Sequence, residues 1–262
     1  MKIVKHYFTK NACYKESNKL IPKGFMIHST GANNPNLCRY IDDAPNLGKN
    51  KYGNHWNQYT PDGRWVCVHG FIGLDKRGEV KVYNTLPVNI QAWHCGGSAN
   101  YSHISYEICE DNLKDKKYFA EAMDTAMQVA AYYCRKYNWT AEKVICHAEG
   151  YRRGSASNHG DIETWLKKHG KNMEWFRDGV RRYIKGNAGT KKPNVKKPSK
   201  FKPYLVKVTV DVLNIRKSPN TKYVPVGSVK KGEVYTIVNK SGNWGKLKSG
   251  AGWICLKYTK KV

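Results

Sequence analysis

The stretch "ICHAEGYRRGSASNHGD" at residues 145–161 concentrates side chains that can do chemistry. It places His147, Glu149, His159 and Asp161 near two arginines, among glycines and serines. Such a polar segment could be a basic surface loop, a contact to nucleic acid, or part of a metal site whose other ligands lie elsewhere in the chain. Imidazole and carboxylate groups are common zinc ligands, so the metal site is the hypothesis with the most specific chemistry.

Three residues, from separate parts of the chain, are candidates for the ligands of a zinc site. Zinc in a catalytic site usually takes three protein ligands and leaves one position for water. His28 ends the apolar run 24–30, where a side chain can point into a cleft above a sheet. His147 follows the apolar residues "VIC", and Asp161 comes after a Gly/Ser-rich loop that can fold back. A single histidine is more often a hydrogen-bonded structural residue, so the residue types alone leave this site as one hypothesis among several.

The cysteines give a different expectation. Cys146 adjoins His147, but successive side chains of an extended segment point to opposite faces, so Cys146 is expected to be buried packing. The chain has eight cysteines and no Cys-x-x-Cys pair, which leaves a zinc ribbon without support. The first residues contain no apolar stretch typical of a secretory signal, so synthesis in a reducing cytosol is expected. Free buried thiols are then favoured, and disulfides remain the alternative that the even count leaves open.

The elements that must position these residues indicate a mixed α/β domain. The runs 24–30 and 103–109 are rich in apolar and aromatic residues and predict strands. Residues 65–85 predict two strands joined by a Gly-containing turn, an antiparallel hairpin. Apolar residues recur at steps of three and four over 115–137 and again over 172–184, which predicts amphipathic helices. We expect a mixed central β-sheet flanked by helices.

A linker divides the chain into two domains. Residues 185–203 hold seven lysines, three prolines and no acid, a composition typical of an extended, self-repelling linker. Residues 1–184 then form the first domain. Residues 204–262 show short β-type runs every 8–12 residues with Gly- and Pro-containing turns between them, which predicts a small all-β barrel.

The charge points to a polyanionic partner. The formal net charge is +26, and residues 185–262 contain 19 lysines and arginines against only two acids. An excess of this kind favours nucleic acid, a membrane surface or an anionic cell-wall polymer as partner, with a merely solubilising surface as the alternative. No apolar run approaches the roughly 18–20 residues of a membrane span.

Several motifs occur in an order that resembles a known family. They are "FMIHST", "VHGFIG", "TLPVNIQAWHCGG", "SHISYEICED", "VICHAEGYRRGSASNHGD" and "WLKKHGK". Over residues 20–182 the chain resembles phage endolysins of the N-acetylmuramoyl-L-alanine amidase type 2 family, which shares its fold with peptidoglycan recognition proteins. The tail, with "LNIRKSPNTKY" and "GNWGKLKSGAGWICLKY", resembles bacterial SH3 modules that bind cell walls. A catalytic domain, a basic linker and a wall-binding module would together make an endolysin.

The resemblance implies a role for each motif residue. His28, His147 and Asp161 match the three Zn²⁺ ligands, and Glu107 matches an acidic residue beside the water that the metal activates. His159 stands where many relatives have lysine, so its charge and role stay open; stabilising the oxyanion and only orienting Asp161 are the two alternatives. For Glu107 the alternative is a salt-bridged carboxylate at the sheet end.

Substrate contacts are expected from three further residues. The resemblance places Trp93 and His94 at the edge of the cleft, where they would contact glycan or peptide, and Arg152 would meet carboxylates of the peptide stem. Each of these has a structural or surface role as its alternative. His69, on a predicted strand, is expected to be a hydrogen-bonded core residue.

The resemblance implies a zinc metallo-amidase that cuts the bond between N-acetylmuramoyl and L-alanine in bacterial peptidoglycan and so lyses the cell. It would be made in the host cytoplasm and act on the wall after release, and the basic linker and SH3-like domain would hold anionic wall polymers. A recognition protein that binds peptidoglycan without cutting it is the second hypothesis. A nucleic-acid binder is the third, but no reading motif accompanies the charge.

Overall fold

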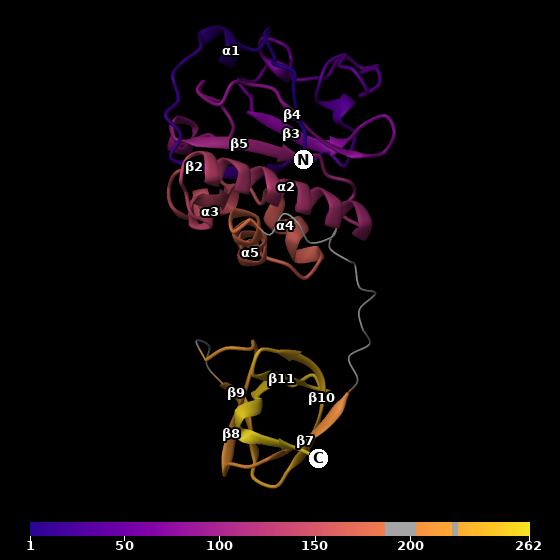
Figure 1. Ribbon diagram of the computed structural model, residues 1–262, viewed down its shortest axis with the longest axis vertical. Helices are drawn as coiled ribbons and strands as arrows, with labels where there is room; N and C mark the ends of the chain where they lie inside the picture. The colour runs from indigo at the N-terminus through magenta and orange to yellow at the C-terminus, as the bar shows by residue number, and fades with distance from the viewer. Residues whose placement is uncertain (187–202, 222–224) are drawn as a thin grey trace. The chain divides into compact units, whose positions relative to one another are not determined.

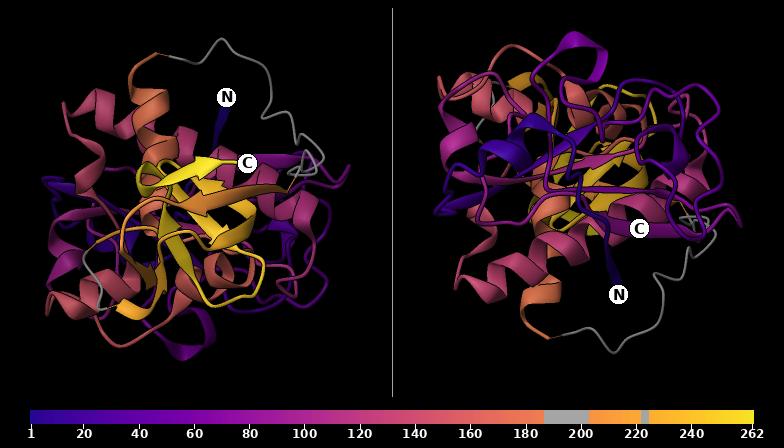
Figure 2. Two further views of the ribbon diagram at one scale, coloured as in Figure 1. Left: turned by 90° about the horizontal axis from the view of Figure 1, so that it is seen from below. Right: turned by 90° about the horizontal axis from the view of Figure 1, so that it is seen from above.

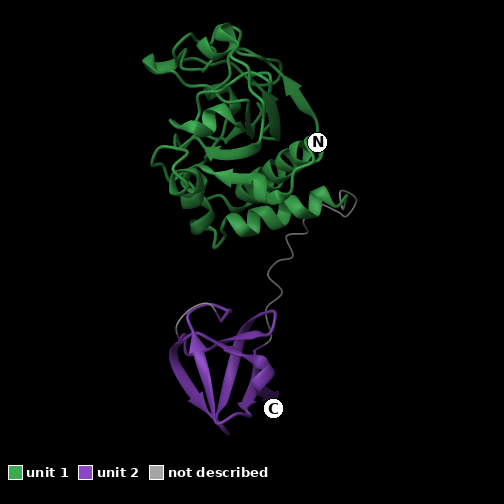
Figure 3. Ribbon diagram, turned by 90° about the vertical axis from the view of Figure 1, so that its left-hand side faces the viewer, with its two compact units in different colours: residues 1–190 green, residues 191–262 purple. Residues whose placement is uncertain are grey.

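The computed structural model describes residues 1–186, 203–221 and 225–262. The chain forms two compact units, unit 1 over residues 1–190 and unit 2 over residues 191–262 (Figure 3). The linker expected at residues 185–203 lies almost entirely outside the described residues. None of the helices in the described part of the chain has the length and apolar content needed to cross a membrane.

Unit 1 is built on a mixed six-stranded sheet of order β1-β4-β3-β5-β2-β6 (Figure 1). Its strands are β1 (Ile3–Lys5), β2 (Gly24–Ser29), β3 (Gly70–Leu74), β4 (Val80–Asn84), β5 (His103–Ile108) and β6 (Val144–Cys146). Its helices are α1 (Ala12–Glu16), α2 (Lys116–Lys136), α3 (His147–Arg152), α4 (Asp161–Lys168) and α5 (Met173–Ile184). Only β3 and β4 pair antiparallel, as the predicted hairpin, and the other neighbours are parallel.

The two faces of this sheet are covered differently. Helices α2, α4 and α5 pack on one face, whereas α1 and long loops cover the other (Figure 1). Strand β2 is buried along its whole length, as expected for a central parallel strand covered on both faces. Its side chains alternate: Phe25 and Ile27 join the helix-side core, while Met26 packs on the opposite face. By the same alternation His28 points to the loop-covered face.

The helices follow from local sequence signals. Helix α2 is capped at its N-terminus by Asp115, whose side chain accepts hydrogen bonds from the backbone N–H groups of Lys117 and Tyr118. Helix α5 is capped in the same way by Asn172, whose side chain accepts a hydrogen bond from the backbone N–H of Trp175. The helices predicted at 115–137 and 172–184 are therefore confirmed. In the predicted hairpin the strands begin only at Gly70, because residues before it run beside another loop, with Cys67 donating to the carbonyl of Trp93.

Unit 2 is an all-antiparallel sheet of order β13-β7-β10-β11-β12-β8-β9. Its strands are β7 (Tyr204–Val208), β8 (Val212–Arg216), β9 (Pro225–Lys230), β10 (Val234–Ser241), β11 (Trp244–Leu247), β12 (Trp253–Cys255) and β13 (Thr259–Lys261). The sheet curls around one apolar core of valine, leucine and isoleucine residues, and its strands cross steeply in the orange-to-yellow part of Figure 2. The small all-β tail predicted from the spacing of β-type runs is confirmed.

The cysteines are all free. Six of the eight are buried, and Cys38 and Cys255 are partly exposed. Cys146 belongs to the core on the helix side of the sheet, as its place beside His147 on an extended segment predicted.

Candidate metal centre

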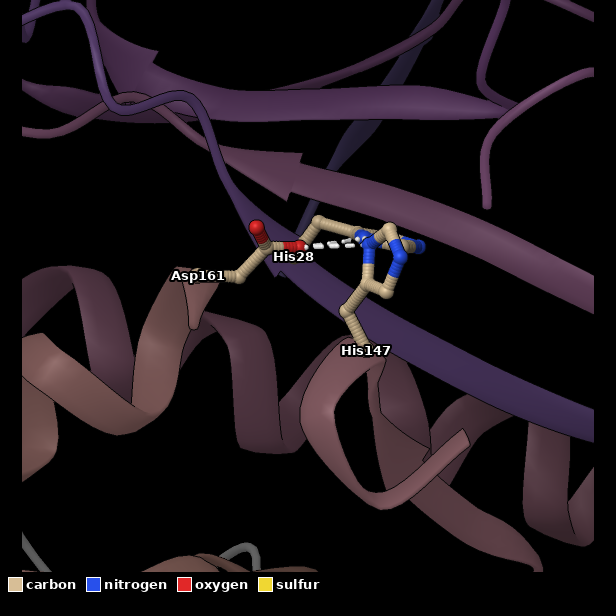
Figure 4. A group of neighbouring side chains, drawn as sticks. All are labelled: His28, His147 and Asp161. Carbon is tan, nitrogen blue, oxygen red and sulfur yellow. Dashed lines mark hydrogen bonds and ion pairs between the residues drawn. The ribbon is translucent and has the colours of Figure 1, made fainter. Parts of the chain in front are cut away.

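Three side chains from distant parts of the sequence meet at one point of unit 1 (Figure 4). The Nδ1 atom of His28 lies 2.8 Å from Oδ2 of Asp161, and Nδ1 of His147 lies 2.9 Å from the same oxygen. The two Nδ1 atoms are 3.2 Å apart. The structure thus brings together the three residues that the sequence nominated as metal ligands.

Strand pairing puts the two histidines side by side. Strands β2 and β6 run parallel with Ile27 opposite Cys146, and the residue that follows each of these two is a histidine. His147 is also the first residue of α3, which starts where β6 ends. Gly150 lets this helix lie close to the sheet, since a Cβ there would come within 2.8 Å of the Met26 side chain.

The third ligand depends on the loop between α3 and α4. The backbone N–H of Ser157 donates to the carbonyl of Cys95, and Ala99 donates to the carbonyl of Ser155. These bonds hold the loop against the segment after His94 and bring Asp161 back over the sheet. Asp161 has φ of 38°, a left-handed conformation that costs a non-glycine residue about 1 kcal/mol. Backbone strain of this kind is typical of functional positions.

The charge states at this point suit metal ligation. Burial alone would raise the pKa of Asp161, but hydrogen bonds from His147 and His28 hold it well below its usual range. Burial lowers the pKa of His28, against the opposing pull of Asp161. The carboxylate is therefore ionised, and the buried imidazole favours its neutral form, which are the forms that bind metals.

The donor set fits a divalent metal ion. Ligand atoms about 2.0–2.1 Å from a tetrahedral ion lie roughly 3.3 Å from one another, and the three separations here are 2.8, 2.9 and 3.2 Å. The two Nδ1 atoms and the carboxylate oxygen lie around one common position, and loss of the Nδ1 protons would turn two imidazole lone pairs toward it. A cation between them would satisfy all three donors at once.

Glu107 lies next to this point on the neighbouring strand. Strands β2 and β5 are parallel, with Glu107 opposite His28, so both side chains are on the same face of the sheet. Glu107 is 8% exposed, and its Oε2 atom is buried without a hydrogen-bond partner. Burial, followed by the carboxylates of Asp161 and Glu110, raises its pKa. Among the described residues no cation pairs with it, so the salt-bridged alternative has no support there.

His159 lies at the exposed edge of the site. Its ring centroid is 4.9 Å from that of His147, and its Nδ1 lies 3.1 Å from the Ser157 hydroxyl oxygen. The same hydroxyl is 3.3 Å from Nε2 of His147. No direct hydrogen bond joins His159 to Asp161 in the described structure, and the contacts of His159 at the site are with Ser157 and His147.

His94 lies closer to the ligands than a cleft-edge residue would. Its Nδ1 atom is 3.0 Å from Nε2 of His28, and its Nε2 atom is buried without a hydrogen-bond partner. Burial lowers the pKa of His94, and His28 adds to this effect. Trp93 is partly buried and packs edge-on against Trp65, with ring centroids 5.9 Å apart.

The remaining sequence candidates have structural partners. The guanidinium of Arg152 pairs with Glu163, which joins α3 to α4, and the nearest N–O distance is 2.6 Å. His69 is a buried, hydrogen-bonded core residue, as expected: its Nε2 donates to the carbonyl of Ile90 and its Nδ1 accepts from the backbone of Ser105.

Two residues at the site were not singled out from the sequence. Ser157 contacts both His147 and His159, and Glu110 accepts a hydrogen bond from the hydroxyl of Ser29, next to the His28 ligand. Burial raises the pKa of Glu110, and the carboxylate of Asp161 adds to it. The only signal in the sequence was their position, Glu110 just after a strand and Ser157 inside the Gly/Ser-rich loop.

Comparison with solved structures shows the fold of unit 1. The hydrolase AmiA of Staphylococcus aureus, solved in complex with its ligand, is 20% identical with a TM-score of 0.50 and covers 72% of this chain and 86% of its own. The catalytic domain of PlyG is 22% identical with a TM-score of 0.47, covering 74% of this chain and 100% of its own. PlyL is 21% identical with a TM-score of 0.48, covering 70% and 99%. Comparison with curated proteins found no match.

Family models match both units. A bacterial SH3 domain model matches residues 211–259, in agreement with the curled antiparallel sheet of unit 2. The N-acetylmuramoyl-L-alanine amidase model matches residues 18–163, more than half of the chain, and this range contains all three converging ligand residues. The chain therefore belongs to the N-acetylmuramoyl-L-alanine amidase family and is a peptidoglycan hydrolase that carries a bacterial SH3 domain.

Proposed function

We propose that this chain is a zinc-dependent endolysin that cuts the amide between N-acetylmuramoyl and L-alanine and thereby lyses the bacterial cell. The observation that carries the proposal is the convergence of His28, His147 and Asp161 within the range that the amidase model matches. The catalytic domain would span residues 1–184, the linker 185–203 and the wall-binding domain 204–262.

Zinc is the metal that this ligand set favours. Two imidazoles and one carboxylate with a remaining open position are typical of catalytic zinc sites. A zinc ion there would polarise the scissile carbonyl and lower the pKa of a water molecule to about 7. His28, His147 and Asp161 would hold it, and His94 would fix the ring of His28 through the hydrogen bond to its other nitrogen.

Glu107 is proposed as the general base. Its free, buried oxygen on the same face as His28 is placed to take a proton from the attacking water and to pass it to the leaving nitrogen of L-alanine. A metal cation held by His28, His147 and Asp161 would favour the ionised form of the Glu107 carboxylate, because an opposite charge nearby lowers its pKa.

His159 is proposed to stabilise the oxygen that becomes negative when the amide is attacked. It lies beside His147 at the exposed edge, where the substrate carbonyl would enter. Hydrogen bonds to such an oxygen are typically worth about 3 to 4 kcal/mol. Trp93 is proposed to contact the glycan, and Arg152 the peptide stem at the outer edge of the site.

The basic part of the chain is proposed to hold anionic wall polymers. In unit 2, Lys207 on β7 lies directly opposite Lys260 on β13, and both are exposed. Like charges directly opposite each other in a sheet are destabilising, so a binding partner is a reason for them to be there. We also propose that the chain is made in the host cytoplasm and reaches the wall on release.

The test combines metal analysis with a product assay. Purified protein should contain about one zinc per chain, and it should release new amino termini from purified cell walls until a chelator is added. His147→Ala should lose both the metal and the activity. Cys146→Ala is the matched control: it changes the adjacent residue on the other face and should keep both. Tight wall binding without any new amino termini would instead identify a recognition protein and overturn the proposal.

A further inference from the structure

Three aromatic side chains, Trp93, Trp65 and Tyr59, form a row in unit 1, called the aromatic row below. The ring centroids of Trp93 and Trp65 are 5.9 Å apart, and those of Trp65 and Tyr59 are 6.0 Å apart. The rings meet at 63° and 67°, an edge-to-face packing that aromatic pairs favour. Tertiary contacts create this row, because Trp93 comes from a different loop than the other two.

The two outer rings of the aromatic row are open to solvent. Trp65 is 46% exposed and Tyr59 is 52% exposed, whereas Trp93 is partly buried against the core of the loop-covered face. Large aromatic side chains that stay exposed side by side forgo the free energy of burial, and such patches mark binding surfaces. The outer end of the row is marked by Lys15 of α1, whose Nζ lies 5.7 Å from the centre of the Tyr59 ring.

The loop that carries the two exposed rings is fixed by a buried side chain. Asn11, the cap of α1, is 1% exposed and donates from Nδ2 to the carbonyls of Trp56 and Val66, at 3.1 and 3.0 Å. The backbone N–H of Ala12 donates to the carbonyl of Tyr59. These bonds hold both ends of the loop against α1. A surface that is fixed before a ligand arrives loses little conformational entropy on binding.

The inner end of the aromatic row adjoins the metal centre. Trp93 directly precedes His94, whose Nδ1 atom lies 3.0 Å from Nε2 of His28. The backbone N–H of Cys67 donates to the carbonyl of Trp93, so the stretch that follows Trp65 runs beside this residue. The row therefore leads outward from the site of the reaction, and a substrate bound there can extend along it.

The bond that this family cuts joins two chemically different halves. One half is a chain of N-acetylated sugars, whose pyranose rings present apolar C–H faces. The other half is a peptide with free carboxylates. Aromatic rings suit the sugars, since flat apolar faces pack against each other, whereas the negative face of an aromatic ring offers nothing to a carboxylate. The chemistry of the row is therefore complementary to the glycan half.

We infer that the aromatic row binds the glycan strand beside the scissile muramoyl unit, with successive sugars packed against successive rings. The inference rests on the proposed amidase function and names the part of unit 1 that recognises the sugars. It makes hydrolysis depend on the length of the glycan. A muramoyl peptide with a single sugar reaches only Trp93, whereas a longer strand also contacts Trp65 and Tyr59.

A soluble oligomer of N-acetylglucosamine tests the row apart from the reaction, because it has sugars of the same class but no peptide and no muramoyl amide. Calorimetric titration of the full chain should show binding. Trp65→Ala should weaken it about tenfold, a loss typical of removing one important aromatic contact. Trp65→Phe keeps an aromatic ring and should retain most of the affinity.

Kinetics on substrates of two lengths provide the second measurement. For Trp65→Ala, the KM for a peptide-bearing glycan oligomer should rise about tenfold, because the lost contact is made equally before and during the reaction. Its kcat, its zinc content and its hydrolysis of a muramoyl peptide with a single sugar should stay unchanged. Tyr52→Ala is the matched control, since Tyr52 is 84% exposed and lies outside the row. It should match the unchanged protein in both measurements.

The outcomes separate this inference from the proposed function. Normal oligomer binding and a normal KM in Trp65→Ala would overturn the inference, as would equal losses in Tyr52→Ala. Binding of free stem peptides that is lost in Trp65→Ala would also overturn it, because the row would then recognise peptide. A chain that binds the oligomer through Trp65 but releases no amino termini from walls would contradict the proposed function and leave the glycan-binding row standing.

Discussion

At the scale of single residues, the site depends on three ligand atoms from distant parts of the chain that meet at one point. His28 and His147 bring imidazole nitrogens to within 3.2 Å of each other, and Asp161 accepts from both. A metal ion bound by these three atoms would explain the arrangement, and Glu107, on the same face of the sheet as His28, has a buried oxygen without a hydrogen-bond partner.

Glu107→Gln tests the proposed base. The amide keeps the size of the side chain but cannot take a proton, so kcat should fall by about 10²- to 10⁴-fold while the zinc content stays the same. The measurement is steady-state hydrolysis of a soluble muramyl peptide together with metal analysis.

Glu110→Gln is the comparison for that variant. Its carboxylate is also buried nearby, but it is hydrogen-bonded to Ser29. Its activity should fall by less than about tenfold, since a neighbouring charge affects the base only indirectly. Equal losses in the two variants would remove Glu107 from the role of base and leave only a shared electrostatic effect.

At the scale of elements, helix α5 holds α3 and therefore His147 in place. Arg177 on α5 donates to both oxygens of Glu149 on α3, at 3.0 Å each, and its side chain is only 14% exposed. Glu149 in turn accepts from the backbone of Cys146 at the start of α3. One ion pair thus ties the helix that carries a ligand to the helix packed outside it.

Arg177→Met should lower the free energy of unfolding by about 2 kcal/mol or more, because it leaves the Glu149 carboxylate partly buried without its cation. It should also weaken zinc binding. Loss of the ion pair would leave zinc binding unchanged if the pair did not help to place His147. Urea unfolding and a zinc competition titration measure the two effects.

Arg181→Met on the same helix is the control. Arg181 pairs with Glu142 and Glu174 at the exposed surface, where ion pairs contribute at most about 1 kcal/mol. Its zinc affinity should be unchanged. If Arg177→Met kept normal zinc affinity, α5 would contribute to stability alone and not to the placement of His147.

At the scale of the whole molecule, the chain combines a reaction site with a separate means of staying on its substrate. The formal net charge of +26 is concentrated after residue 184, where there are only two acids. Attachment of the tail would raise the local concentration of the catalytic unit at the wall without adding any contact at the site.

Removal of residues 185–262 should therefore lower the rate on intact walls by about tenfold or more, while hydrolysis of soluble muramyl peptides continues. Wall binding by the full chain should weaken between about 50 mM and 500 mM salt, and the shortened chain should lose most of this dependence. Sedimentation of the protein with purified walls measures binding. A salt response that survives the deletion would place the electrostatic attraction in unit 1.

Local patterns in the sequence were sufficient to predict α2, α5 and the central strands of unit 1, but not α1, α3 and α4. The periodicity of three and four predicted α2 and α5, and alternating or continuous apolar runs predicted the central strands, because these patterns depend only on neighbouring residues. The order of motifs predicted the family, and with it the residues that would bind the metal. Linker position and substrate contacts stay predictions.

Only the tertiary structure decided which of these residues meet. Parallel pairing of β6 with β2 placed His147 beside His28, and loop contacts brought Asp161 back to both. It also paired Arg152 with Glu163 and placed His94 against His28. Each of these results depends on strand register and on contacts between distant segments, which no local pattern of residues contains.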